Sequence, residues 1–129
     1  MAPPNMARQT CFLGFSVISM NEKSPRVLKA SSSRFAAMQM DLGNCMEAGG
    51  DPLATLKRFP GRSQTIHLKE AGGPATAVVG EGDVNWKEVF EICRTTGGTR
   101  WYIVEHEREV GAPLDNVRRC LENLRKMGK

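Results

Sequence analysis

Three side chains of the metal-binding type, Asp41, His67 and Glu105, lie at the ends of three short apolar segments. They are separated along the chain by 26 and 38 residues. Two carboxylates and an imidazole form a hard-to-borderline ligand set that suits Mn, Mg, Co or Zn. A divalent cation held by such a set can act as a Lewis acid. We therefore predict a divalent-metal site at these three residues.

The three apolar segments are expected to form strands, over Ala37–Leu42, Thr65–Leu68 and Trp101–Val104. Helical patterns follow each of them. The first helix begins with Asp51 as N-cap and Pro52 at its first position, and the second begins at the capping pair Asn85 and Glu88. A third helix begins at Pro113. Apolar residues at helical spacing are expected on one side of each of the last two helices. In the helix that begins at Asn85 they are Trp86, Val89, Phe90 and Cys93. In the helix that begins at Pro113 they are Leu114, Val117, Leu121, Leu124 and Met127.

Strands that alternate with helices indicate an α/β fold built on a parallel sheet. The three candidate ligands are on average 32 residues apart, close to the roughly 31 residues that one unit of an eight-unit (β/α)8 barrel occupies. In such folds the carboxyl ends of the strands share one face, where ligands bind. The three side chains are therefore expected to converge.

Each residue also has an ordinary structural interpretation. An Asp at a strand end often caps a helix, a His on an apolar strand is often a hydrogen-bonded core residue, and Glu105 belongs to an acidic cluster with Glu107 and Glu109. The matching positions of the three on successive units favour the metal site.

A glycine-containing loop could be mistaken for a phosphate-binding loop. Its segment Gly80-Glu81-Gly82 lacks the third glycine of the dinucleotide fingerprint, so we interpret the glycines as turn residues.

Charge and cysteine content limit the classes of partner. The net charge of +4 comes entirely from residues 1–40, and residues 41–129 carry thirteen groups of each sign. Nucleic-acid binding would require a clustered basic face, so it is not expected. No apolar run reaches the roughly 18 residues of a membrane span. Four cysteines without a CxxC pair favour reduced thiols and a cytoplasmic location.

Residues 1–36 form an atypical amino-terminal segment, distinct from the regular units over residues 37–129. Its apolar run and Ser-rich, acid-poor stretch have some similarity to a secretory or transit leader, but neither has a convincing cleavage site. We expect one buried strand, Phe12 to Ile18, followed by a loop or a short helix.

A series of motifs in the order of the chain resembles the carboxyl-terminal half of the sugar phosphate isomerase/epimerase family, which are xylose isomerase-like TIM barrels. The resemblance covers about residues 38–129. It implies that Asp41, His67 and Glu105 bind a divalent metal, that Glu105 is catalytic, and that Asn44, where many relatives have His, and Lys69 contact a sugar or sugar phosphate. The motifs are Met40–Asn44, Ala48–Pro52, His67–Glu70, Gly80–Trp86 and Val104-Glu105.

The reaction implied by this resemblance, an isomerisation or epimerisation in carbohydrate metabolism, moves a proton at a carbon next to a carbonyl. Family enzymes use two metal-bound glutamates, one on each face of the substrate. Residues 1–36 offer only Glu22, and 129 residues make about half a barrel, so we expect a truncated or misjoined front end and a chain that is inactive in epimerisation by itself.

Two other functions remain open from the sequence. A non-catalytic half-barrel would expose an unpaired sheet edge, which favours a homo-oligomer. An endonuclease-type relative would use the same barrel and metal site on DNA, but it would need more ligands and a basic face.

Overall fold

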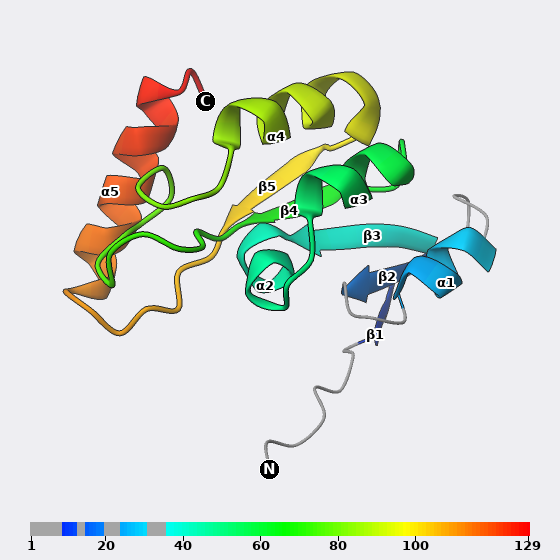
Figure 1. Ribbon diagram of the computed structural model, residues 1–129, viewed down its shortest axis with the longest axis horizontal. Helices are drawn as coiled ribbons and strands as arrows, with labels where there is room; N and C mark the ends of the chain where they lie inside the picture. Colours follow the sequence, from blue (N-terminus) through cyan, green and yellow to red (C-terminus); the bar gives the residue numbers. More distant parts are fainter. Residues whose placement is uncertain (1–8, 13–14, 20–23, 31–35) are drawn as a thin grey trace, which may run out of the picture.

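The computed structural model describes residues 9–12, 15–19, 24–30 and 36–129. Their strands form one five-stranded sheet in the order β1-β2-β3-β4-β5 (Figure 1). The β2–β3, β3–β4 and β4–β5 pairs are parallel, whereas β1 pairs with β2 antiparallel. The strands are β1 (Gln9–Phe12), β2 (Phe15–Ser19), β3 (Ala36–Asp41), β4 (Thr65–Leu68) and β5 (Trp101–Val104).

The predicted α/β class with parallel βα units is confirmed, and helices α1 to α4 lie on one side of the sheet (Figure 1). None of the helices in the described ranges is long and apolar enough to cross a membrane. The helices are α1 (Ser24–Ala30), α2 (Leu42–Glu47), α3 (Pro52–Arg58), α4 (Trp86–Ile92), continued by the π-helix η1 (Cys93–Gly97), and α5 (Pro113–Lys126).

Local signals set the helix boundaries. The Asp51 carboxylate accepts a hydrogen bond from the Ala54 N–H (3.0 Å) and caps α3. The Asn85 side chain accepts from the Glu88 N–H in the same way and caps α4. Gly98, with φ of 69°, ends η1 in the left-handed conformation that glycine adopts without strain. The helices expected after Asp51 and Asn85 are confirmed.

Two parts of the fold differ from the sequence prediction. The single strand expected over residues 12–18 is instead two strands, β1 and β2, with residues 13 and 14 outside the described residues. The strand expected to reach Leu42 ends at Asp41, because Asp41 caps a further helix, α2, which begins at Leu42.

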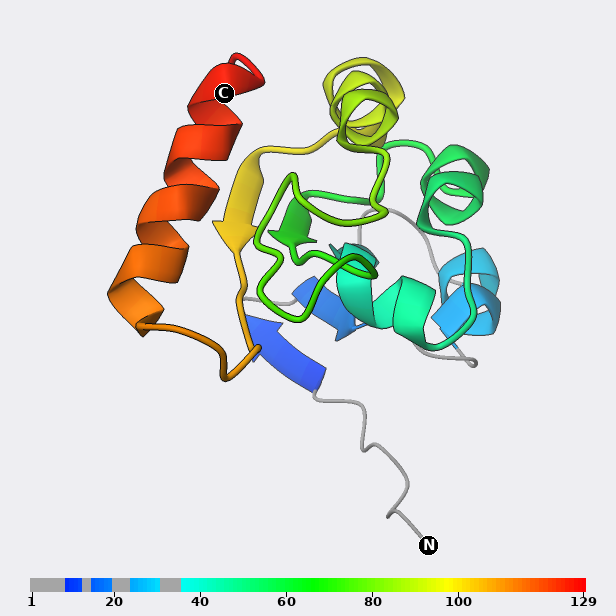
Figure 2. The same cartoon turned by 60° about the vertical axis from the view of Figure 1, so that its left-hand side comes forward.

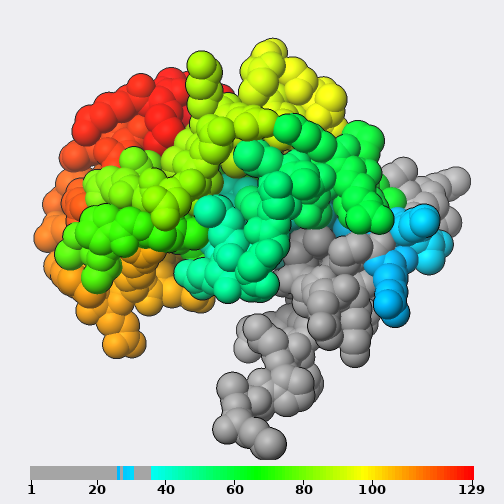
Figure 3. All heavy atoms as spheres, in the orientation of Figure 1, coloured from blue at the N-terminus to red at the C-terminus, as the bar shows by residue number. Residues whose placement is uncertain are grey.

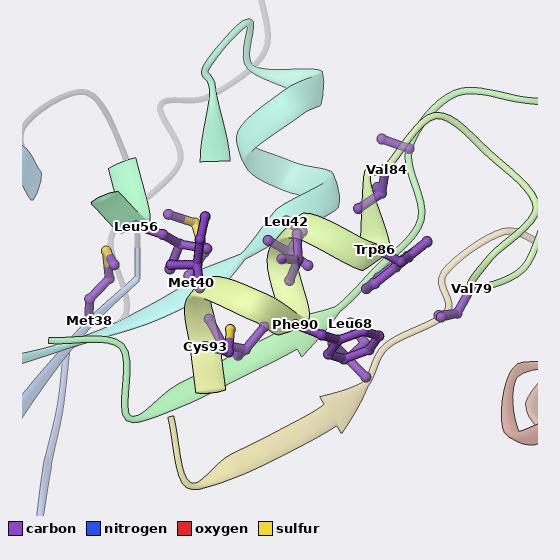
Figure 4. Close-up of a cluster of buried hydrophobic side chains, with 14 of the residues drawn as sticks. Met38, Met40, Leu42, Leu56, Leu68, Val79, Val84, Trp86, Phe90 and Cys93 are labelled. Carbon is purple, nitrogen blue, oxygen red and sulfur yellow. The ribbon is translucent and has the colours of Figure 1, made fainter. Parts of the chain in front are cut away.

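The core lies between the sheet and helices α2, α3 and α4. Met38 and Met40 on β3 and Ile66 and Leu68 on β4 are buried against this helix layer. Figure 4 shows the β3 methionines and Leu68 directed toward side chains of α3, α4 and η1. In the space-filling view the helices and the loop before α4 cover the front face (Figure 3). The core side chains predicted for the helix at Asn85 are confirmed: Trp86, Val89, Phe90 and Cys93 are all buried.

Helix α5 packs differently from the prediction. It lies on the side of the molecule where β5 forms the sheet edge (Figure 2). Its buried residues are Asn116, Cys120 and Leu124. Three of the five residues of the expected apolar stripe are exposed instead. Helix α5 is held against the loop before α4, to which Arg119 and Asn123 donate hydrogen bonds, and this contact buries a different side of the helix. The exposed members of the stripe are Leu114, Val117 and Leu121, whose exposed fractions are 80%, 50% and 46%.

Candidate metal centre

The strand register brings the three candidate ligands together. Asp41 and His67 are direct partners in the β3–β4 ladder. His67 is paired with Ile103 of β5, and Glu105 lies two residues further on, so by strand alternation its side chain is on the same face. One ligand atom from each of Asp41, His67 and Glu105 lies within 4.8 Å of the other two. The convergence expected from the sequence is present.

The imidazole of His67 fits a metal centre. Its Nδ1 faces the Glu105 carboxylate oxygen Oε2, while its Nε2 is buried and has no hydrogen-bond partner among the described residues. A buried polar atom without a partner costs free energy unless a water or an ion completes its environment. Two carboxylates beside such a ring form the donor set of a divalent-cation site.

Asp41 has two structural tasks at once. Its Oδ1 accepts a hydrogen bond from the Asn44 N–H (2.9 Å), which caps α2, and its Oδ2 accepts from the Asn44 side-chain amide (2.6 Å). Burial raises the pKa of the Asp41 carboxyl above its ordinary value, the Asn44 backbone hydrogen bond opposes this rise, and the charge of Glu105 adds to it. Asp41 thus caps α2 from a position within 4.8 Å of the other two candidate ligands.

Lys69 connects the remaining side chains of the site. Its Nζ donates to Asn44 Oδ1 (2.7 Å) and to Glu107, and it lies 3.6 Å from Glu105 Oε1. Burial by itself disfavours the ammonium, but the hydrogen bond with Glu107 and the nearby carboxylate charges raise the pKa of Lys69. The same hydrogen bond lowers the pKa of Glu107. Lys69 is therefore a cation held in place beside the triad.

The structure adds Glu107 and Glu70 to the residues chosen from the sequence. The sequence shows Glu107 only as a member of an acidic cluster, and because it lies beyond the end of β5 its pairing with Lys69 has no signal in the strand pattern. Glu70 directly follows Lys69 but is buried at 4% exposure and belongs to a separate network. Glu22, the only glutamate of residues 1–36, lies outside the described residues.

The Glu70 carboxylate organises the loop between β4 and α4. Its Oε1 accepts from the N–H groups of Ala71 and Val84 (both 3.1 Å), and its Oε2 accepts from the Gly80 N–H and the Trp86 indole (both 2.8 Å). The turn interpretation of the glycines is confirmed, since Gly80 has φ of 92°. This loop forms the rim of the site next to Lys69.

Comparison with solved structures gives two close matches in fold. Both are sugar phosphate isomerases/epimerases from Parabacteroides distasonis, with TM-scores of 0.66 and 0.68 at 18% and 22% sequence identity. The matches cover 78% and 82% of this chain but only 34% and 36% of the solved chains. This chain has the fold of part of a sugar phosphate isomerase/epimerase. The resemblance noted from the sequence motifs is thus confirmed for the fold.

Sequence comparison gives distant relatives that are named as dehydratases. An inosose dehydratase from Clostridium tetani is 21% identical over 111 residues, covering 71% of this chain and 37% of the relative. An inosose dehydratase from Bacillus thuringiensis is 22% identical over 121 residues, which cover 78% of this chain and 41% of the relative. The chain therefore spans about two fifths of the length of these relatives. No family model matches the sequence.

Proposed function

We propose that this chain forms the metal-binding, proton-transferring side of a divalent-cation-dependent sugar isomerase or epimerase. The observation that supports the proposal most directly is the meeting of Asp41, His67 and Glu105 at the carboxyl ends of three adjacent parallel strands. In barrel enzymes this face is the catalytic one. The likeness in fold to sugar phosphate isomerases/epimerases supports a carbohydrate as the class of substrate.

In the proposed site, Asp41, His67 and Glu105 would hold Mn, Mg, Co or Zn. A bound divalent cation would supply Lewis-acid polarisation of the substrate carbonyl. Asn44 and Lys69 would contact substrate hydroxyl groups, because their polar ends lie next to the triad and are already held by hydrogen bonds to one another. A substrate group bound there would find donors and acceptors that need little reorganisation.

Glu105 is the proposed catalytic base. Its two oxygens face different neighbours: Oε2 faces His67, and Oε1 lies 3.6 Å from Lys69 Nζ. Oε1 would take the proton from the carbon next to the carbonyl, the C–H electron pair would delocalise toward the carbonyl oxygen, and Lys69 would favour the negative charge that develops. The protonated Glu105 would then trade its proton with solvent, and delivery of the solvent-derived proton to the same face of the carbon would complete an exchange. Epimerisation would need a second donor on the opposite face.

Exchange of this proton with solvent tests the proposal. The chain loaded with Mg²⁺ is incubated in D₂O with a panel of ketoses, and deuterium incorporation is measured by mass spectrometry. We expect incorporation without epimerisation, and a loss of about 100-fold or more in Glu105→Gln, because a positioned general base contributes about that factor. Glu109→Gln, an exposed acid of the same loop, is the matched control. Exchange that is absent, or that persists in Glu105→Gln, contradicts the proposal.

We further propose a reducing compartment, the cytoplasm, as the setting of this chain. Cys45, Cys93 and Cys120 are free thiols. Burial is the main reason why the pKa of each thiol is raised. Thiols that resist ionisation are weak nucleophiles and are stable in the reduced form.

A second candidate function is self-association, and a specific surface favours it. Strand β5 is an edge strand whose Trp101, Tyr102 and Ile103 are exposed at 71%, 41% and 41%. Trp101 and Ile103 lie on one face of the strand by alternation, and α5 exposes a further apolar stripe. Exposed apolar side chains of this kind mark an interface. We propose a second copy of this chain as the partner, because an edge strand pairs readily with its own symmetry mate.

The mass in solution tests the second candidate. Light scattering after gel filtration is expected to give twice the chain mass of 14.2 kDa. Trp101→Lys and Leu114→Lys should each shift the protein to a monomer, since a lysine on an edge strand or apolar patch opposes pairing. Thr95→Lys, which adds the same charge at an exposed site of η1, should remain dimeric. A monomeric wild-type chain rules this candidate out.

A further inference from the structure

A hollow of about 230 Å³ adjoins the triad on the side of Lys69. It lies between the ends of β4 and β5 and helix α2, where a substrate of the proposed reaction would have to bind. Its lining is strongly charged. The residues that line it are Glu47, Lys69, Glu70, Glu105, His106, Glu107 and Arg108.

Acidic groups dominate this lining, with four carboxylates against two cations. Lys69 is enclosed by Asn44, Glu105 and Glu107. Arg108 donates from Nη1 to the Pro74 carbonyl (2.6 Å) and from Nη2 to the Gly72 carbonyl (2.7 Å). A divalent cation at the triad would offset the charges of Asp41 and Glu105, and the remaining carboxylates would still outnumber the two cations. A phosphate dianion in this hollow would be repelled.

The loop that could bind a phosphate is already occupied by an internal anion. In many folds a phosphate lies against the backbone N–H groups of a glycine-rich turn. Here the N–H groups of Gly80 and Val84, and the Trp86 indole, donate to the Glu70 carboxylate instead. A side chain added at Gly82 would come within 2.7 Å of Glu70 Oε1. The absence of a side chain at Gly82 thus makes room for the chain's own carboxylate.

We infer that the site recognises an unphosphorylated carbohydrate, bound through its carbonyl and hydroxyl oxygens, and rejects sugar phosphates. This inference rests on the proposed function and narrows its substrate class. Lys69 and Asn44 present polar groups suited to uncharged hydroxyls, whereas Glu47 and Glu107 oppose an added phosphate. Glu47 is the specificity-determining residue that is easiest to test, because it is exposed on α2 and has no described hydrogen-bond partner.

The test compares fructose with fructose 6-phosphate on the Mg²⁺-loaded chain by titration calorimetry. We expect fructose to bind at least about tenfold more tightly, the effect of roughly one unfavourable charge contact at short range. Glu47→Lys should reduce this preference about tenfold. The control, Glu122→Lys on the exposed side of α5, should leave the preference unchanged because the residue lies outside the hollow.

The outcomes separate this inference from the function on which it rests. Tighter binding of fructose 6-phosphate, binding of neither sugar to the cation-loaded chain, or the same effect from both lysine variants would overturn the inference. A wild-type chain that binds no divalent cation would instead overturn the proposed metal centre itself.

Discussion

Replacing Asp41 by Asn is expected to weaken Mn²⁺ binding about 100-fold or more, since even residues that only orient a metal ligand change affinity by roughly 10–100-fold. The substitution removes the charge and the acceptor of the Asn44 side-chain amide, but it retains the helix cap. Asn is as good an N-cap as Asp, so α2 keeps the hydrogen bond from Asn44 that begins the helix. His67→Ala and Glu105→Ala should lower the affinity to a similar extent. Titration calorimetry with Mn²⁺ measures all three variants.

The matched control for this experiment is Asp51→Asn. Asp51 caps α3 through the same type of hydrogen bond, at 3.0 Å from the Ala54 N–H, and it does not belong to the triad. Its substitution should therefore leave Mn²⁺ affinity unchanged. Equal affinities in wild type, Asp41→Asn, His67→Ala and Glu105→Ala would show that these residues do not form a metal centre.

Replacing Glu70 by Gln is expected to lower the free energy of unfolding by about 3 kcal/mol, because hydrogen bonds to a charged group contribute roughly 1.5–3 kcal/mol and unpaired buried donors add a penalty. A glutamine offers only one oxygen, so two of the four N–H donors would face an NH₂ group. Glu70→Ala leaves all four without this acceptor and should lower stability further. Both losses are a large fraction of the 5–15 kcal/mol typical of a domain.

Urea unfolding followed by circular dichroism measures this effect. Glu109→Gln makes the same chemical change at an exposed position and should shift the midpoint little. Because α5 is attached to the same loop through Arg119 and Asn123, Glu70→Gln should also increase amide exchange in α5. An unfolding midpoint equal to that of wild type would mean that the loop does not depend on the Glu70 carboxylate.

Local sequence signals predicted the helices at Asp51 and Asn85 well because each begins at its own capping residue. The strands Thr65–Leu68 and Trp101–Val104 were predicted with their observed bounds, since both are short apolar runs next to turn residues. Helix α2 was missed for a physical reason. It has only six residues, includes Gly43 and Asn44, which are poor helix formers, and depends on the Asp41 cap and on packing against β4.

The face of α5 that becomes buried could not be predicted from its own periodicity. Its stripe of Leu114, Val117 and Leu121 is apolar, yet Asn116 and Cys120 are buried instead. The Asn116 amide donates to the Val110 carbonyl (2.8 Å) and contacts His106 at 3.0 Å. A buried polar residue of this kind is favoured by hydrogen-bond partners that lie outside the helix, so the helical repeat does not reveal it.

The alternation of strands and helices and the identity of the three candidate ligands could be predicted from the residues alone, because capping, periodicity and residue chemistry are local properties. The register that pairs Asp41 with His67 and brings Glu105 beside them is visible only in the folded chain. The same holds for the pairing of Lys69 with Glu107 and for the binding of the glycine-rich loop by Glu70. These contacts join residues 10 to 38 positions apart, and they arise from strand pairing and burial, which no single segment specifies.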